Sequence, residues 1–430
     1  MHLKYLFSNG KPNHPSDERE SRLNLIVGLP LFLLLVFTTG TVFVKQAWAL
    51  QSFQIGIYVL VAAVLVIGLR RNTEPIPMHS AAWLVYLIPL WGIVQLIAHT
   101  TSSTFATRAE ILRWGSLAGV FFLTLVVARS VAARRVILTV MLGFATAMAV
   151  LCLLQLFTSD GAVLWLFPSG YHDVYATFPN HSNYAQFAEL FLPLALWRAL
   201  MEGWRSWWYA VAGGVMYASV IGSASRAGTL LCTLEVVVIL VIWLIRQRNA
   251  AAKQKKKGDL RSTIAMVALI PVLAAFFTFA VGWQHVMDRF QTKHPIAARW
   301  DFLVAAIHMA ESKPAVGFGL GTFPEVYQRY AIKDYPFYAN HAHNDWAEFA
   351  ADGGIPFLLL VLIPFVAVIP TAIRHPWGLG LIIAMMHACV DFPFPRPAVS
   401  GWMFALLALL YMRRESDLHA KRKAVEKSIS

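Results

Sequence analysis

The sequence predicts an all-α protein that crosses a membrane many times and forms a single integral membrane domain over residues 1–430. Two observations lead to this fold class. The chain is 58% hydrophobic and only 14% charged, with a mean hydropathy of +0.57. Runs of about 17–25 apolar residues, each long enough to cross a bilayer as a helix, recur along its whole length. These values exclude an ordinary soluble domain and a disordered chain.

We expect about twelve transmembrane helices in the chain. The polar segment 1–22 precedes the first of them, and that first span lacks a small-residue cleavage pattern. It is therefore interpreted as a retained anchor and not as a signal peptide. The expected spans are 23–43, 52–69, 80–98, 114–129, 136–157, 184–201, 208–223, 227–245, 263–282, 353–370, 377–391 and 399–412.

Lysine and arginine residues indicate which connections face the cytoplasm, because positively charged loops stay on that side. The strongest marker is the basic loop 246–262, which carries a cluster of lysines. With this loop inside, both termini and the tail 413–430 are cytoplasmic. A large loop on the outer side of the membrane, 283–352, then connects the ninth and tenth helices, and we expect it to be helical over Ala297–Ser312.

The formal charge of +13 is compatible with nucleic acid or with lipid as a partner. Most basic residues lie in short loops between spans, where positive charge sets the topology and meets anionic lipid. We therefore expect membrane lipids and no nucleic acid, and no protein partner is deduced. Cys152, Cys232 and Cys389 all fall in hydrophobic segments, without disulfide or metal spacing.

A polar cluster, residues 340–354, lies where the large loop meets the tenth span. His343 is its leading candidate, because an unperturbed imidazole titrates near pH 6.5 and can accept a proton at neutral pH. Asp345 and Glu348 are close in sequence and could orient it. The alternative is an interfacial histidine that only caps the helix together with Asn344.

Two neighbours of His343 complete this cluster. If a helix begins near Asn344, His341 points elsewhere, so it is the second candidate for the base. Asn344 either caps that helix or contacts substrate.

Two arginines on the expected outer side are candidates for anion binding. Arg226, in Gly222-Ser223-Ala224-Ser225-Arg226, begins a membrane helix, where free N–H groups, hydroxyls and a guanidinium suit a phosphate. Its alternative role is to reach lipid phosphate at the interface. Arg299 lies on the expected loop helix, where a surface ion pair with Asp301 or Glu311 is the alternative.

The remaining polar motifs have structural and functional interpretations. Glycines alternate in 314–323, which favours a tight turn that packs loop backbone on the membrane core. Asn180 or Ser182 could cap the sixth span, and Glu235 lies within the eighth, where an unpaired carboxylate is costly. The further candidates for substrate contact in the outer cavity are His341, Asn344, Asn180, His181 and Arg396.

Three motifs, taken in chain order, resemble the O-antigen ligase family. They are Ser225-Arg226-Ala227-Gly228, then Arg299 ahead of Pro314–Gly321, then His343-Asn344 ahead of Gly353-Gly354. That family shares a conserved domain with O-antigen polymerases and bacterial O-oligosaccharyltransferases. The resemblance covers roughly residues 175–400. Each motif is loose, but their order, spacing and side of the membrane together are fairly specific.

The resemblance implies an inverting, metal-independent glycosyltransferase without a cofactor, with a periplasmic active site in the bacterial inner membrane. The implied donor is a glycan on undecaprenyl diphosphate, and the implied acceptor is a hydroxyl of the lipid A–core oligosaccharide. Carried onto this sequence, it makes His343 the general base and assigns the diphosphate to Arg226 and Arg299. A good leaving group needs little beyond positioning and a base, which agrees with this assignment.

Other activities stay open at this point. An O-antigen polymerase or an O-oligosaccharyltransferase would use the same donor, although the latter usually carries a longer soluble extension than the tail after residue 412. A transporter of lipid-linked glycan would place polar groups near the middle of several spans, where only Glu235 is prominent.

Overall fold

The computed structural model describes residues 15–71, 78–170, 173–202, 207–252, 296–333, 335 and 338–429, with Val272 and Phe276 as isolated positions. The expected span 263–282 lies outside the described residues except at those two positions. The lysine cluster of the basic loop and residues 283–295 of the expected outer loop are also not among the described residues.

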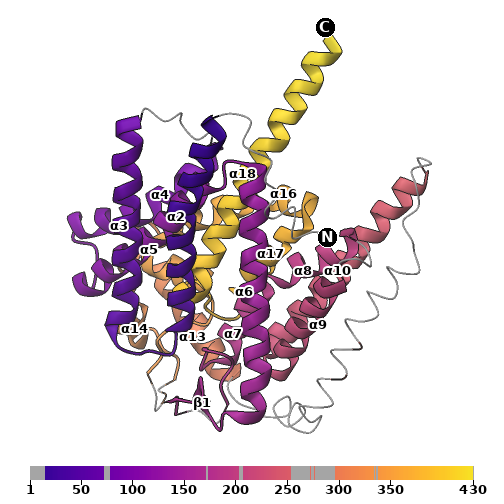
Figure 1. Ribbon diagram of the computed structural model, residues 1–430. Helices are drawn as coiled ribbons and strands as arrows, with labels where there is room; N and C mark the ends of the chain where they lie inside the picture. Colours follow the sequence, from indigo (N-terminus) through magenta and orange to yellow (C-terminus); the bar gives the residue numbers. More distant parts are fainter. Residues whose placement is uncertain are drawn as a thin grey trace.

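The described chain is a bundle of α-helices, with one short hairpin of strands β1 and β2 that pair antiparallel. Figure 1 shows α18 passing through the middle of the bundle. The elements are α2 (Pro15–Gly40), α3 (Ala47–Arg71), α4 (Ser80–Ile97), α5 (Thr104–Val127), α6 (Val131–Thr158), β1 (Ala162–Val163), β2 (Phe167–Pro168), α7 (His181–Glu189), α8 (Leu192–Glu202), α9 (Trp207–Gly222), α10 (Arg226–Ala252), α13 (Ile296–Ser312), α14 (Phe323–Val326), η2 (Tyr327–Arg329), α15 (Asp345–Val366), α16 (Ile369–Arg374), η3 (Pro376–Gly378), α17 (Leu379–His387) and α18 (Pro397–Ile429).

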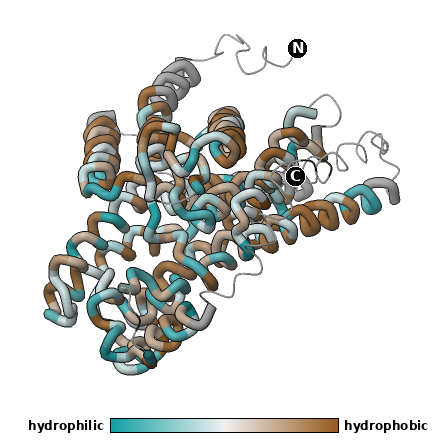
Figure 2. Tube along the Cα trace, turned by 90° about the horizontal axis from the view of Figure 1, so that it is seen from below, coloured by the Kyte–Doolittle hydropathy of each residue, from teal (hydrophilic) through white to brown (hydrophobic). Residues whose placement is uncertain are grey.

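Among the described residues, six helical segments are long and apolar enough to cross a membrane. They are Ala47–Leu69, Ser80–Ile97, Thr104–Val127, Val131–Thr158, Arg226–Asn249 and Asp345–Arg374. Two shorter apolar helices, Ile26–Gly40 and Pro376–His387, accompany them. Figure 2 shows hydrophobic residues along most of α10, the rod at the right, with hydrophilic residues toward the end that adjoins the grey trace. The all-α membrane class is therefore confirmed, and the count of twelve spans stays a prediction.

Every expected span except 263–282 overlaps a described helix, in the same order, but several ends differ. The span expected at 114–129 begins earlier, at Thr104, and the one expected at 353–370 begins at Asp345. The span expected at 399–412 continues as helix to Ile429. Polar residues extend these helices past the apolar stretch, because backbone hydrogen bonding does not require an apolar sequence.

The span expected at 184–201 is divided between α7 and α8. Pro193 has no N–H to donate to the carbonyl of Glu189, so the helix is interrupted there. Gly380 of α17 packs against the freed carbonyls of Glu189 and Leu190, where a Cβ atom would collide with them. The break thus brings α7 and α17 into close contact.

The glycine-rich segment 314–321 packs on the start of α15, as predicted. Phe318 N donates to Ala351 O at 3.1 Å, and Gly319 N donates to Asp352 O at 2.8 Å. Gly354 has a φ of 72° and interrupts α15, and a Cβ there would lie 2.7 Å from the carbonyl carbon of Ala315. This approach holds the segment 314–321 against the bundle.

Candidate active site

The candidate site lies at the end of the bundle that carries α13, α14 and the β-hairpin, the lower end in Figure 1. It forms where the first turn of α15 meets the end of α17. Asn344 caps α15, as predicted, because its Oδ1 accepts from Ala347 N at 3.0 Å. Its Nδ2 donates to Cys389 O at 2.8 Å, and Asp345 N donates to Ala388 O at 2.9 Å. These bonds join two chain segments into one rigid corner.

His343 immediately precedes this cap, and its φ of 53° is unusual for a residue with a side chain. Its Nδ1 lies 3.2 Å from Oδ1 of Asp391 in the turn after α17. Its side chain is 24% exposed, so the imidazole is accessible from outside the bundle. The backbone conformation thus directs a partly exposed imidazole onto a buried carboxylate.

The expectation that Asp345 or Glu348 orients His343 is wrong, because the first turn of α15 carries both away from it. Asp345 Oδ2 accepts from Phe394 N at 3.0 Å. Glu348 instead holds His341, whose Nδ1 lies 2.9 Å from its Oε1, and accepts from Ala342 N at 2.7 Å.

Asp391 connects His343 to Arg299. Its Oδ2 lies 3.9 Å from Nη2 of Arg299 on α13, and its side chain is only 2% exposed. Burial by itself would raise the pKa of Asp391, but the hydrogen bond with His343 and the charges of Arg299, His343 and His387 outweigh it. The pKa falls to about 2. Asp391 is therefore ionised at neutral pH.

Arg299 does not form the surface ion pair that was its alternative. Asp301 is engaged by the hydroxyl of Tyr335, and Arg299 faces Asp391. The structure thus brings Arg299 and His343, two residues predicted to act together, onto one carboxylate.

Phe392 separates the two histidines. Its ring stacks on that of His341 with centroids 4.5 Å apart, and meets that of His343 edge-on at 4.9 Å. The guanidinium of Arg396 lies over the same ring, 5.5 Å from its centroid. Arg396 therefore belongs to the site region, and Phe392 fixes the spacing of two imidazoles and one cation.

A small cavity of about 80 Å³ adjoins His341 and extends toward α5. Its polar lining includes Glu348, Asp352 and the ion pair of Glu110 with Arg113. Each of the two histidines thus has its own carboxylate, but only the carboxylate beside His343 also faces Arg299.

Arg226 begins α10, at a turn where Ala224 has a φ of 52°. Ser225 Oγ accepts from Gly228 N at 3.2 Å and so caps the helix. Gly228 packs against Ala185 of α7, where it leaves no room for a side chain. The predicted helix N-terminus is present, and the meeting of Arg226 with His343 and Arg299 stays a prediction.

Asn180 and His181 begin α7. Asn180 Oδ1 accepts from Ser182 N at 2.8 Å and from Asn183 N at 3.3 Å, so Asn180, and not the alternative Ser182, caps the helix. His181 Nδ1 lies 3.3 Å from Ser182 Oγ. Their contact with substrate stays a prediction.

Glu189, at the far end of α7, holds the element that carries Asp391. Its carboxylate lies 2.9 Å from Nδ1 of His387, and both side chains are fully buried. Asp391 N in turn donates to His387 O at 3.0 Å. The buried pair therefore fixes the end of α17, which leads into the turn that carries Asp391.

Sequence reasoning missed Asp391, Phe392 and the pair of Glu189 with His387. The signal for Asp391 was its place at the head of the proline-rich turn 391–397, as the one acid between two apolar segments. Glu235 is buried, and within the described part of the chain its carboxylate oxygens have no hydrogen-bond partner. No group of three or more His, Cys, Asp or Glu that could hold a metal ion occurs in the described ranges.

The apolar helices and the polar corner at one end of them define a helical membrane protein with an enzyme-like site at the bundle end. Residues 211–362 match the family model described as O-antigen ligase, so the resemblance predicted from the motifs is confirmed. This segment contains Arg226, Arg299 and His343, whereas Asp391 lies beyond it. The match indicates a glycosyltransferase-like membrane enzyme that uses lipid-linked glycans. No curated protein matches the chain.

Proposed function

We propose that this protein is an O-antigen ligase, which transfers a glycan from undecaprenyl diphosphate to a hydroxyl of lipid A–core oligosaccharide. The reaction would take place at the periplasmic face of the bacterial inner membrane. The observation that carries the proposal is the contact of His343 and Arg299 with one buried carboxylate, Asp391, next to the segment that matches the family.

His343 is suited to act as a general base because of Asp391. An ionised carboxylate can only accept hydrogen bonds, so Nδ1 of His343 carries the hydrogen and donates it to Asp391. Nε2 of the neutral imidazole then keeps its lone pair and can accept a proton. His341 is paired with Glu348 in the same way, but the carboxylate of Glu348 does not contact Arg299.

In the proposed step, the acceptor hydroxyl oxygen attacks the anomeric carbon of the donor glycan. A new C–O bond forms while the bond from that carbon to the diphosphate oxygen breaks, and the bonding electrons leave with the diphosphate. The hydroxyl proton passes to Nε2 of His343. Attack from the side opposite the leaving group inverts the anomeric centre.

Arg299 and Arg226 would stabilise the charge that develops on the diphosphate. The side chain of Arg299 is 35% exposed and its Nη2 lies 3.9 Å from Oδ2 of Asp391, so its remaining N–H donors can turn toward a ligand. Arg226 adds a second cation at a capped helix N-terminus, where backbone N–H groups and the helix dipole favour anions.

The experiment uses purified protein in nanodiscs with a polyprenyl-diphosphate glycan and lipid A–core as acceptor. We expect wild-type protein to attach glycan to the core and His343→Ala to lose transfer by at least roughly 100-fold. The matched control is His99→Ala. His99 is an exposed histidine after the end of α4, and its φ of 53° equals that of His343. Wild-type rates in His343→Ala would remove His343 from the mechanism.

The same assay, run with one acceptor at a time, separates the ligase from its relatives. A polymerase would instead extend a second polyprenyl-linked glycan, and an oligosaccharyltransferase would modify a protein hydroxyl. If the glycan reaches either of those acceptors but not the core, the ligase assignment is wrong, and the assignment of the base and the arginines is tested on that acceptor.

A further inference from the structure

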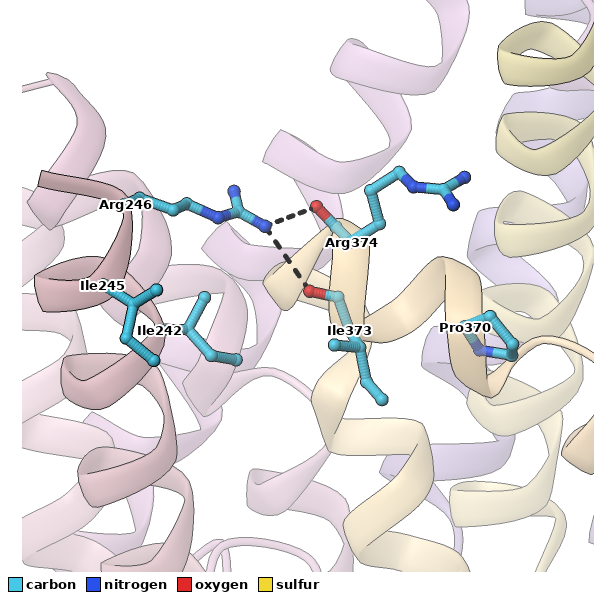
Figure 3. Close-up of a pocket in the computed structure, with 6 residues that line it drawn as sticks. All are labelled: Ile242, Ile245, Arg246, Pro370, Ile373 and Arg374. Atoms are coloured by element: carbon cyan, nitrogen blue, oxygen red, sulfur yellow. Dashed lines mark hydrogen bonds between the residues drawn. The ribbon is translucent and has the colours of Figure 1, made fainter. Parts of the chain in front are cut away.

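A groove of about 350 Å³ opens between α10 and the segment around α16. It is formed by Ile242, Ile245, Arg246, Pro370, Ile373 and Arg374, which Figure 3 shows from the side. The two isoleucines at its rim, Ile245 and Ile373, are about half exposed, at 53% and 51%. Four of the six residues are apolar and the other two are arginines, so the groove has no acid in its lining.

The apolar and charged parts of the groove are arranged in two levels. In Figure 3 the aliphatic side chains are spread along the lower level, with Ile242 and Ile245 on one side and Ile373 and Pro370 facing them, and the guanidiniums of Arg246 and Arg374 lie above. A ligand that fits both levels has an apolar body and an anionic head.

Both arginines are held at that edge and keep donors for a ligand. Nη2 of Arg246 donates to Arg374 O at 2.8 Å and Ile373 O at 3.4 Å, and its guanidinium lies 4.7 Å from the ring centroid of Trp197. Nη1 of Arg374 lies 3.5 Å from Asp417, with the side chain 51% exposed. An arginine has five N–H donors, so these contacts leave several for phosphate oxygens.

The groove lies at the opposite end of the bundle from the candidate active site. The apolar segment of α10 begins at Arg226 and ends at Asn249, and Arg246 lies close to that second end. The apolar segment that starts at Asp345 likewise ends at Arg374. Figure 1 shows α16 and the end of α10 in the upper part of the molecule, away from α13 and α14. By the predicted topology, this end faces the cytoplasm.

We propose that this groove is a binding site for an anionic phospholipid of that leaflet. The phosphate contacts Arg246 and Arg374, and one acyl chain lies along Ile242, Ile245 and Ile373. Charge complementarity selects the lipid: a headgroup with net negative charge is favoured over a zwitterionic one, since no lining residue offers an acid to an ammonium group. The inference is independent of the proposed transfer reaction.

The test measures binding of dioleoyl phosphatidylglycerol and dioleoyl phosphatidylethanolamine to the full chain in detergent by native mass spectrometry. We expect phosphatidylglycerol to bind more tightly, and Arg246→Gln/Arg374→Gln to weaken it roughly tenfold or more. The matched control is Arg135→Gln/Arg248→Gln, which removes two exposed arginines from the same end. Soluble glycerol phosphate should not compete, because it lacks an acyl chain.

The proposal would be overturned by equal affinity for both lipids or by unchanged phosphatidylglycerol binding in the double variant. It would also be overturned if Arg135→Gln/Arg248→Gln lost as much phosphatidylglycerol binding as Arg246→Gln/Arg374→Gln. Competition by glycerol phosphate would also contradict it. If the double variant does not fold, Arg374→Gln alone replaces it, with an expected loss of roughly fivefold. His343→Ala should bind the lipid as wild type does, so failure of the transfer proposal leaves this result unaffected.

Discussion

The carboxylate of Asp391 lies 3.2 Å from Nδ1 of His343, although the two residues are 48 positions apart in the chain. The turn after α17 and the residue before α15 meet only because Asn344 and Asp345 bind the backbone at the end of α17. In the proposed mechanism this contact determines which nitrogen of His343 acts as the base, so it is the first target for mutation.

Replacing Asp391 by Asn should lower kcat for glycan transfer by roughly 100-fold. The amide can donate to Nδ1 of His343 and so favour the tautomer in which Nε2 carries the hydrogen. In that tautomer Nε2 has no lone pair with which to accept the proton of the acceptor hydroxyl. KM should change much less, because the Asp391 side chain is only 2% exposed and offers little surface to a substrate. Steady-state rates over donor and acceptor concentrations measure both. Glu311→Gln, an exposed change on α13, is the control, and a kcat as low in that variant would contradict the assignment.

The stability of the protein should depend on Asp391 in acid. The pKa of its carboxyl is about 2 in the folded protein against an ordinary value of 3.8, so folding favours the ionised form. That contribution, about 2 kcal/mol, is complete above about pH 5 and is lost as the pH falls toward 2. The difference in melting temperature between wild type and Asp391→Asn in detergent should therefore shrink markedly from pH 5 to pH 3. A difference in melting temperature that stays constant over this pH range would show that folding does not lower the pKa of the Asp391 carboxyl.

Phe392 should matter for both histidines at once. Its side chain is buried and contacts the rings of His341 and His343. Phe392→Ala should destabilise the protein by about 3–5 kcal/mol and reduce kcat, because both imidazoles lose the surface that orients them. Phe392→Leu keeps most of the volume and should retain more stability and more activity. Equal activity in the alanine and leucine variants would mean that the ring does not position the histidines.

Local patterns predicted much of the fold and part of the site. Apolar runs indicated the helices, and the position of Asn344 before a helical segment predicted its cap. The choice between carboxylates could not be predicted, because Asp345 and Glu348 are near His343 in sequence but the first turn of α15 rotates them away. The true partner, Asp391, depends on how α17 packs against α15, and no local pattern contains that packing. The interruption of α15 at Gly354 was equally hidden, since it follows from contact with Ala315.

Gly354→Ala should be strongly destabilising. The position has a φ of 72°, and a Cβ would lie 2.7 Å from the carbonyl carbon of Ala315. Strain and collision together should cost about 2 kcal/mol or more and loosen the loop that carries the glycine-rich turn. The control is Gly143→Ala, an exposed glycine in α6 with open space around it, where alanine should stabilise the helix by up to about 1 kcal/mol. Melting temperatures that move in the same direction for both variants would contradict the prediction that position 354 requires glycine.

The buried pair of Glu189 and His387 should position Asp391 without touching substrate. Removing His387 by mutation to Ala leaves the Glu189 carboxylate buried without its partner, which should cost about 3–5 kcal/mol of stability. The double variant Glu189→Leu/His387→Leu removes both polar groups and should recover much of that loss. It still lacks the link that holds α17 to α7, so kcat should stay below wild type while stability returns. Stability and kcat that recover together in the double variant would show that the pair serves folding alone.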